Sequence, residues 1–337
     1  MSMRRIAVEE AFVTREVAAE WDKALASRFV EPGFLKMGQS ILAKTPATSE
    51  LHERLFDLGA GRLAQMDSDG IDLAVLSLTS PGVQVFDAAT ATALAAAAND
   101  VLAAAVKAHP TRFTGLAAIA PHFPKGAVAE LERAAGRLGM KGVIINSHTH
   151  GEYLDDSKYW PILEAAESLD LPIYLHPREP GPGMAGPYLD YGLFFASWGF
   201  AADAGLHAMR LILSGTFDRF PKLKIVLGHM GEGIPFWLQR IDNRYQVEVK
   251  IGASEKLPRL PSEYFLENFV ITTSGVTSGP ALRLALDMLG PDRILFAADY
   301  PYEIVADAVS FLDGAAITEA ERAKIYSQNA VRVFRLG

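Results

Sequence analysis

Short apolar runs and amphipathic stretches alternate along the whole chain. Runs rich in β-branched and aliphatic residues predict eight strands. They span residues 4–8, 71–78, 113–119, 141–146, 172–176, 224–229, 269–273 and 293–298. The runs lack the polar alternation of a half-exposed sheet. This indicates strands buried on both faces, as in a parallel sheet that helices cover.

Helix-forming stretches lie between these strands. Leu51, Leu55, Leu58, Leu63 and Met66 recur at helical spacing and predict one helix, which an Asp-Ser-Asp-Gly segment ends. The other predicted helices span 88–108, 125–138, 157–169, 203–214, 233–247, 279–289 and 318–333. Alternating strands and helices are βα units, and eight of them favour an α/β fold closed into a (β/α)8 TIM barrel. An open doubly wound sheet is the alternative, but no Gly-rich phosphate loop follows the first strand.

Two insertions interrupt the βα pattern. Residues 15–50 follow the first strand, have some helical character and end in a segment rich in Pro, Thr and Ser. Residues 177–200 follow the fifth strand and combine Pro, Gly and aromatic residues. Both insertions leave the carboxyl ends of strands, where TIM barrels build their active sites.

Composition narrows the class of protein. Half of the 337 residues are hydrophobic and no linker is evident, so we expect one barrel domain over residues 1–337. The apolar runs of five to eight residues fall short of the roughly 18 that span a bilayer, which argues against a membrane partner. The absence of cysteine excludes thiolate chemistry, and a cytoplasmic location is the default. A net charge of −8 without basic blocks argues against a nucleic-acid partner.

Titratable residues gather at the predicted carboxyl ends of the strands. Glu9 and Asp299 follow the first and last strands, and His148, His176 and His229 lie at or just past the fourth, fifth and sixth. A lone histidine there is more often bonded to a loop carbonyl, and Glu9 alone could cap a helix. Buried carboxylates need positive charge, however, so their convergence at one barrel mouth favours a divalent cation. One imidazole and two oxygen donors suit Mn²⁺, with Zn²⁺ as the second choice.

Two further residues lie in or beside the Gly-His-Met-Gly turn and the helix that follows it. His229 would stand at the helix N-terminus, where the dipole disfavours added positive charge, so a neutral hydrogen-bonding or acid/base role is expected. Arg240 lies beside the apolar stripe of the same helix. It is either a solvated arginine or a partner for a substrate carboxylate, in its own or a neighbouring subunit's site.

Several segments together resemble a known family. IAVEEAF, KGVIINSH, PIYLHPRE, KIVLGHMGEGIPFWLQRID and ILFAADYPYE are similar to the amidohydrolase-related non-oxidative aromatic acid decarboxylases. These enzymes act on γ-resorcylate, 2,3-dihydroxybenzoate and 5-carboxyvanillate. The resemblance runs through residues 4–335, and the 5-carboxyvanillate type is the closest by text.

The resemblance implies roles for particular residues. Glu9, His176 and Asp299 correspond to the metal ligands, His229 to a histidine beside the substrate, and Arg240 to the arginine that pairs with its carboxylate. His148 and Tyr302 are further expected substrate contacts, and Asp299 is also the expected proton carrier. Most superfamily members carry a second ligand where this chain has Ala11, which leaves a coordination position open. The carboxyvanillate enzymes place an arginine near residues 44–53, where this chain offers Lys44.

The implied reaction is decarboxylation of an ortho-hydroxybenzoate such as 5-carboxyvanillate or a dihydroxybenzoate. A metal-dependent hydrolase such as a lactonase is the alternative, because the same residues would serve it. The third possibility is a barrel without catalytic activity that only binds a small aromatic acid. Phe236, Trp237 and the aromatic segment 191–200 predict assembly into an oligomer, unless they pack over the barrel mouth as a lid. The resemblance implies a homodimer or homotetramer.

Overall fold

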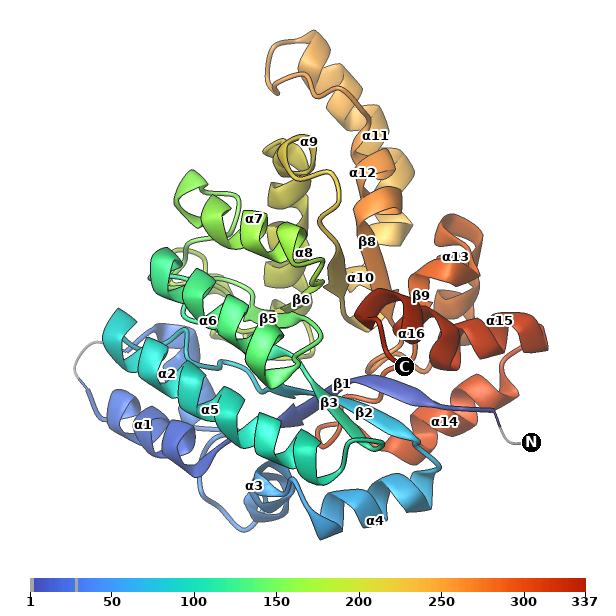
Figure 1. Cartoon of the computed structure of the whole chain (residues 1–337). Coiled ribbons are helices and arrows are strands. Elements are labelled where there is room, and N and C mark those ends of the chain that lie inside the picture. Colours follow the sequence, from blue (N-terminus) through green and yellow to red (C-terminus); the bar gives the residue numbers. More distant parts are fainter. Residues whose placement is uncertain (1–2, 28–29) are drawn as a thin grey trace.

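A ring of parallel strands forms the centre of the computed structural model, which describes residues 3–27 and 30–337 (Figure 1). The strands are β1 (Ile6–Phe12), β2 (Leu73–Leu78), β3 (Phe113–Gly115), β4 (Ala117–Ala118), β5 (Val143–Asn146), β6 (Ile173–His176), β7 (Ile225–Leu227), β8 (Phe269–Thr272) and β9 (Ile294–Leu295). Every described ladder between them is parallel. All eight predicted strands are present. The third is divided at Leu116 into β3 and β4.

Backbone hydrogen bonds join two parallel sheets into a closed ring. One sheet has the strand order β1-β2-β3, and the other runs from β4 to β9. Leu116 N–H donates to the Leu76 carbonyl at 2.9 Å, which continues the ring past β3. On the other side, Val8 N–H donates to the Phe296 carbonyl at 3.1 Å, which ties β1 to the segment after β9. The predicted (β/α)8 barrel is therefore confirmed, and its strands are buried along their length, as the unbroken apolar runs required.

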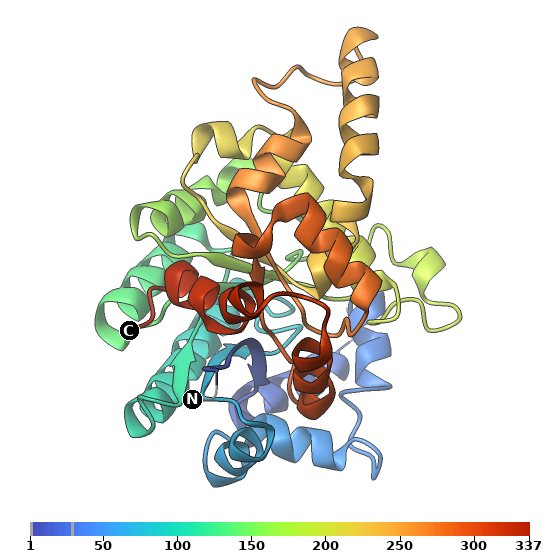
Figure 2. The same cartoon turned by 90° about the vertical axis from the view of Figure 1, so that its right-hand side faces the viewer.

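Helices surround the ring on all sides that Figures 1 and 2 show. They are α1 (Arg15–Leu25), α2 (Pro32–Gly38), α3 (Ser49–Phe56), α4 (Ala60–Asp69), α5 (Ala88–Ala108), α6 (Pro124–Leu138), α7 (Trp160–Ser168), α8 (Gly199–Leu213), α9 (Thr216–Arg219), α10 (His229–Glu232), α11 (Ile234–Lys250), α12 (Pro261–Asn268), α13 (Gly279–Leu289), α14 (Val305–Gly314), α15 (Glu319–Ala323) and α16 (Asn329–Phe334). Short 3₁₀ turns span Ser157–Tyr159, Gly186–Tyr188 and Pro291–Arg293, and a π-turn spans Lys324–Gln328.

The helix predicted from Leu51 to Met66 is wrong, because the chain forms α3 and α4 there. The Asp57 side chain accepts hydrogen bonds from the backbone N–H groups of Gly59 at 2.7 Å and Arg62 at 2.8 Å. These bonds satisfy the free donors at the start of α4, so a new helix begins. The predicted helix at 318–333 is likewise divided, by the π-turn at Lys324–Gln328.

Helix α5 is a long apolar helix that the short apolar runs of the predicted strands do not include. Its 21 residues are long and apolar enough to cross a membrane by length and composition alone, because alanine dominates them. Because alanine is small, the segment does not stand out as a run of large aliphatic residues. In the structure Ala91, Ala95, Ala98 and Leu102 are buried and the helix packs on β3 and β4. The apolar face of α5 is therefore buried against the strands of the barrel.

The two insertions take different forms. The first contains α1 and α2, and α3 begins at its end. The second is irregular apart from the turn at Gly186–Tyr188, and it leads into α8. Helix α11 projects from the body of the molecule in both views (Figures 1 and 2). Both insertions reach the mouth of the barrel, where the titratable residues lie.

Candidate metal and active site

The carboxylate of Glu9 lies inside the barrel, between strands from its opposite sides. Glu9 is 3% exposed, and one of its oxygens, Oε2, accepts hydrogen bonds from the hydroxyls of Tyr174, Thr272 and Ser274. The other oxygen, Oε1, has no hydrogen-bond partner among the described residues. Strand β1 does not end at Glu9 as expected but continues to Phe12, with a register shift against β2 between Ala7 and Glu10. Such a bulge re-aims a side chain.

His176 and Asp299 bring their donor atoms to the same place. Nδ1 of His176 bonds to the Pro177 carbonyl at 2.7 Å, so this nitrogen carries the proton and Nε2 presents its lone pair. Nε2 lies 3.6 Å from the free Glu9 Oε1. One donor atom from each of Glu9, His176 and Asp299 lies within 4.8 Å of the others. The three residues therefore form a cluster of donor atoms that could hold a single divalent cation.

His229 lies beside this group and is held by a carboxylate. Its Nε2 is 3.8 Å from both Glu9 Oε1 and Asp299 Oδ2, and its Nδ1 bonds to Glu232 at 2.7 Å. Burial opposes the charged ring, but the carboxylates of Glu232 and Glu9 raise the pKa of His229 well above its ordinary value. The sequence-based expectation of a neutral His229 did not include Glu232, whose carboxylate favours the charged ring.

The carboxyl groups of the site differ in their pKa values. Burial raises the pKa of Asp299, and the negative charge of Glu9 adds to the rise. Burial also acts to raise the pKa of Glu9, but the imidazoles of His229 and His176 and the hydroxyl donors bring it below its ordinary value. The site therefore pushes the pKa values of its two carboxyl groups in opposite directions.

Two site residues have left-handed backbone conformations. Asp299 has a φ of 62° and His229 a φ of 49°, a region that non-glycine residues rarely adopt. Such strain persists where surrounding contacts over-determine the conformation, and it concentrates at functional sites. The turns after β7 and β9 thus aim both side chains at the barrel mouth.

A cavity of about 170 Å³ opens above these residues. Its polar wall contains His176, His229, Asp299 and Tyr302, and the Tyr302 hydroxyl shares a 2.7 Å hydrogen bond with Thr79. Thr79, Ser80 and Glu303 also line the cavity, and both insertions add apolar and small side chains: Met37, Ile41, Pro177, Phe195, Ala196 and Phe200. Apolar and aromatic walls with a few convergent polar groups suit a small aromatic ligand.

The aromatic residues of the second insertion divide between the cavity and the surface. Phe195 and Phe200 line the cavity as a lid would, with ring centroids 4.9 Å apart. Tyr191 and Trp198 instead face outward, with 96% and 61% of their surface exposed. The lid and the exposed aromatic surface therefore belong to different residues of one segment.

Two expected substrate contacts lie outside this cavity. His148 is fully buried, with Nε2 bonded to the Glu179 carbonyl at 2.9 Å and Nδ1 accepting from Gly151 N–H at 3.0 Å. Both ring nitrogens are taken, so His148 is a structural residue of the loop after β5. Arg240 is exposed on α11 and lines a separate groove between α8 and α11. Among the described residues, those that line the cavity beside the donors do not include Arg240.

Sequence reasoning missed three residues that complete the site: Tyr174, Thr272 and Glu232. A signal was available for each. Tyr174 and Thr272 lie two positions before His176 and Ser274, and alternate residues of a strand share a face. Glu232 follows His229 by three positions, within reach across one turn.

A comparison with protein families places the chain. The amidohydrolase model matches residues 47–336. The chain belongs to the amidohydrolase family. Gamma-resorcylate decarboxylase of Polaromonas sp. is 41% identical over 295 residues, which cover 85% of this chain and 90% of that protein.

Two solved structures are similar to this amidohydrolase over nearly their whole length. The 5-carboxyvanillate decarboxylase of Sphingomonas paucimobilis is 45% identical, with a TM-score of 0.96 and 100% of each chain covered. The 5-carboxyvanillate decarboxylase of Novosphingobium aromaticivorans, crystallised with manganese and 4-hydroxy-3-methoxy-5-nitrobenzoic acid, is 39% identical. Its TM-score is 0.97, and 99% of this chain and 97% of that chain are covered.

Proposed function

We propose that the chain is a metal-dependent, non-oxidative decarboxylase of an ortho-hydroxybenzoate-type aromatic acid. The partnerless Glu9 Oε1, facing His176 Nε2 at the base of an aromatic-walled cavity, carries the proposal. The decarboxylases among its relatives support this reaction over a lactonase or a barrel that only binds its ligand.

The donor set fits one divalent ion, with Mn²⁺ preferred and Zn²⁺ as the second choice. A buried carboxylate oxygen without a partner needs positive charge, and an imidazole with two carboxylates suits a hard ion that keeps open positions. The manganese-containing relative supports the same choice. When bound, the ion would supply the charge that favours the phenolate over the phenol form of the substrate.

We assign the proton transfers to Asp299. Its carboxylate takes the proton of the ortho-hydroxyl and delivers it to the ring carbon that bears the carboxylate. The carbon–carbon bond then breaks, CO2 leaves, and the electron pair of that bond restores the aromatic ring. The raised pKa of Asp299 suits a group that must both hold and release a proton. His229, held by Glu232, and Tyr302 orient the carboxylate.

The cavity lining favours a substrate with a single carboxylate. Among the described residues, the lining contains no lysine or arginine, and Glu303 adds a further acid. Lys44, the expected partner of a second acidic group, instead pairs with Asp22 at 2.5 Å in a different groove. A second ring carboxylate would thus lose its hydration without gaining a cation. We therefore place dihydroxybenzoates ahead of 5-carboxyvanillate.

We further propose that the enzyme is one barrel domain that acts as a cytoplasmic homodimer or homotetramer. Phe236 and Trp237 expose 68% and 50% of their surface on the projecting helix α11, which suits a subunit interface. Arg240 lies on the same helix, so assembly could bring it to the substrate carboxylate of a neighbouring site.

The test is a substrate panel with Mn²⁺-reconstituted protein. CO2 release is measured from 2,6-dihydroxybenzoate, 2,3-dihydroxybenzoate and 5-carboxyvanillate, and acid release from aromatic lactones is measured in parallel. We expect CO2 from the hydroxybenzoates and a higher kcat/KM for the monocarboxylates. Acid from lactones with no CO2 from any benzoate would overturn the proposed reaction.

A further inference from the structure

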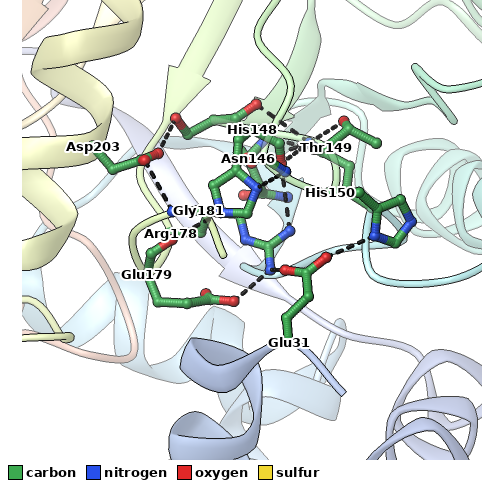
Figure 3. Close-up of polar contacts among 12 residues, drawn as sticks. Glu31, Asn146, His148, Thr149, His150, Arg178, Glu179, Gly181 and Asp203 are labelled. Carbon is green, nitrogen blue, oxygen red and sulfur yellow. Dashed lines mark hydrogen bonds and ion pairs between the residues drawn. The ribbon is translucent and has the colours of Figure 1, made fainter. Parts of the chain in front are cut away.

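A buried arginine joins the loop after β6 to the first insertion. Arg178 has no exposed surface, and its guanidinium pairs with Glu31 at 2.7 Å and with Glu179 (Figure 3). The same side chain donates to the His148 carbonyl at 3.4 Å. A buried cation between two carboxylates loses much of its stabilisation when one partner is removed, because the remaining charges stay buried.

Glu31 is held from a second side as well. His150 Nδ1 bonds to Glu31 Oε1 at 2.6 Å, and His150 Nε2 bonds to the Phe86 carbonyl at 3.1 Å. Figure 3 shows Glu31 between Arg178 and His150, beside the start of helix α2. Two loops of the barrel mouth thus converge on one carboxylate.

Helix α2 begins directly at this carboxylate. Glu31 is its N-cap and Pro32 its first residue. A Cβ added at Gly33 would overlap the side chain of Glu179, so the first turn of α2 packs against Glu179 with no room to spare. The helix is therefore fixed by charge at its N-cap Glu31 and by close packing at Gly33, two residues later.

The far end of α2 reaches the substrate cavity. Met37 in α2 and Ile41 three residues past its end line the cavity, and Pro177, next to Arg178, lines it too. Pro177 also accepts the hydrogen bond that orients His176. One buried cluster therefore fixes both the apolar wall and the loop after β6.

We propose that Arg178 and Glu31 form a clamp that positions α2 as a wall of the substrate cavity, which makes both residues positioning residues for substrate binding. This rests on the proposed function for the identity of the ligand. A second metal site is the competing interpretation, since donors of Glu31, His148 and Glu179 also lie within 4.8 Å of one another. Arg178 already balances both carboxylates, however, and neither nitrogen of His148 is free.

Glu31→Gln tests the clamp, with Glu50→Gln on the exposed surface of α3 as the matched control. Hydrogen exchange of residues 32–38 and steady-state kinetics are measured on the Mn²⁺-loaded enzyme. We expect faster exchange in α2, a KM raised about tenfold and a kcat within about twofold of wild type. Manganese content should not change, and the control should match wild type throughout.

Gly33→Ala provides a second route, because it displaces α2 from Glu179 and keeps every charge. It should shift exchange and KM in the same direction as Glu31→Gln. Unchanged KM in both variants would overturn the clamp, as would loss of manganese or a fall in kcat alone. If wild type releases no CO2 from any hydroxybenzoate, the proposed function fails; unchanged exchange of residues 32–38 in both variants would still overturn the clamp on its own.

Discussion

Glu9 Oε1 and His176 Nε2 lie 3.6 Å apart, although β1 and β6 are not neighbours in the barrel ring. The carboxyl ends of parallel strands converge at one mouth, which is how residues so distant in sequence meet. Tyr174, Thr272 and Ser274 occupy the other Glu9 oxygen and fix the carboxylate's direction. These bonds leave the other oxygen, Oε1, directed toward His176.

Replacing Asp299 with asparagine should separate metal binding from proton transfer. Asp299→Asn keeps an oxygen donor but cannot carry the proton, so we expect substantial manganese content and a kcat lower by about 10³-fold. Metal analysis and CO2 release measure the two effects, with Asp307→Asn on the exposed face of α14 as control. Normal turnover in Asp299→Asn would show that another group donates the proton.

Glu232→Gln should weaken catalysis through His229. The amide can still accept the Nδ1–H bond, but it removes the negative charge that raises the pKa of His229. We expect kcat to fall by about 10- to 100-fold, as for other residues that orient site histidines, with manganese content unchanged. Glu164→Gln, on the exposed face of α7, is the matched control. A wild-type kcat would leave Glu232 without the role given to it.

The sequence predicts the barrel well because its signals are local. Eight buried strands require continuous apolar runs, and those runs are visible without any tertiary information. Helix boundaries are harder to predict, because the hydrogen bonds to the Asp57 side chain start a new helix inside a periodic leucine pattern. Local capping there overrides the periodicity.

The site was predictable as far as strand ends define it. Glu9, His176 and Asp299 follow from their positions after strands, and the structure brings them together. His148 occupies an equivalent position, yet its ring turns into the buried cluster around Glu179. The pairing of Glu31 with Arg178 joins distant segments, and no local pattern could have found it.

The Glu31 contribution to stability should fade in acid. Burial alone would raise the pKa of Glu31, but Arg178 and the bond from His150 lower it to about 2 from 4.5. A lowered pKa stabilises the folded chain above the unfolded value and loses that stabilisation as pH falls toward 2. The shift corresponds to about 3 kcal/mol. The raised pKa of His150 adds stabilisation below its ordinary 6.5, which is lost as pH rises.

Urea unfolding of wild type and Glu31→Gln at several pH values checks this dependence. The difference in unfolding free energy should be largest near pH 5.5 and should shrink steadily between pH 4.5 and pH 3. A difference that stays constant over this range would mean that Glu31 stabilises the fold without its charge.

Complementation between subunits tests the place of Arg240. If Arg240 serves a neighbouring site, Arg240→Met and Asp299→Asn should each be inactive alone. Their mixed dimer would contain one intact site. Co-refolding equal amounts should then restore about a quarter of wild-type activity, from the mixed dimers among random pairs. Activity no higher than that of the separate variants would place Arg240 in its own chain's site or outside catalysis.

We propose that Glu9, His176 and Asp299 hold the single ion on which decarboxylation depends. Chelated protein is titrated with Mn²⁺ while bound metal and CO2 release from 2,6-dihydroxybenzoate are measured together. We predict that activity is absent without metal and rises to a plateau at one Mn²⁺ per chain, and that Glu9→Gln binds the ion more weakly. Full activity in the chelated protein, or a plateau unrelated to bound metal, would contradict the claim.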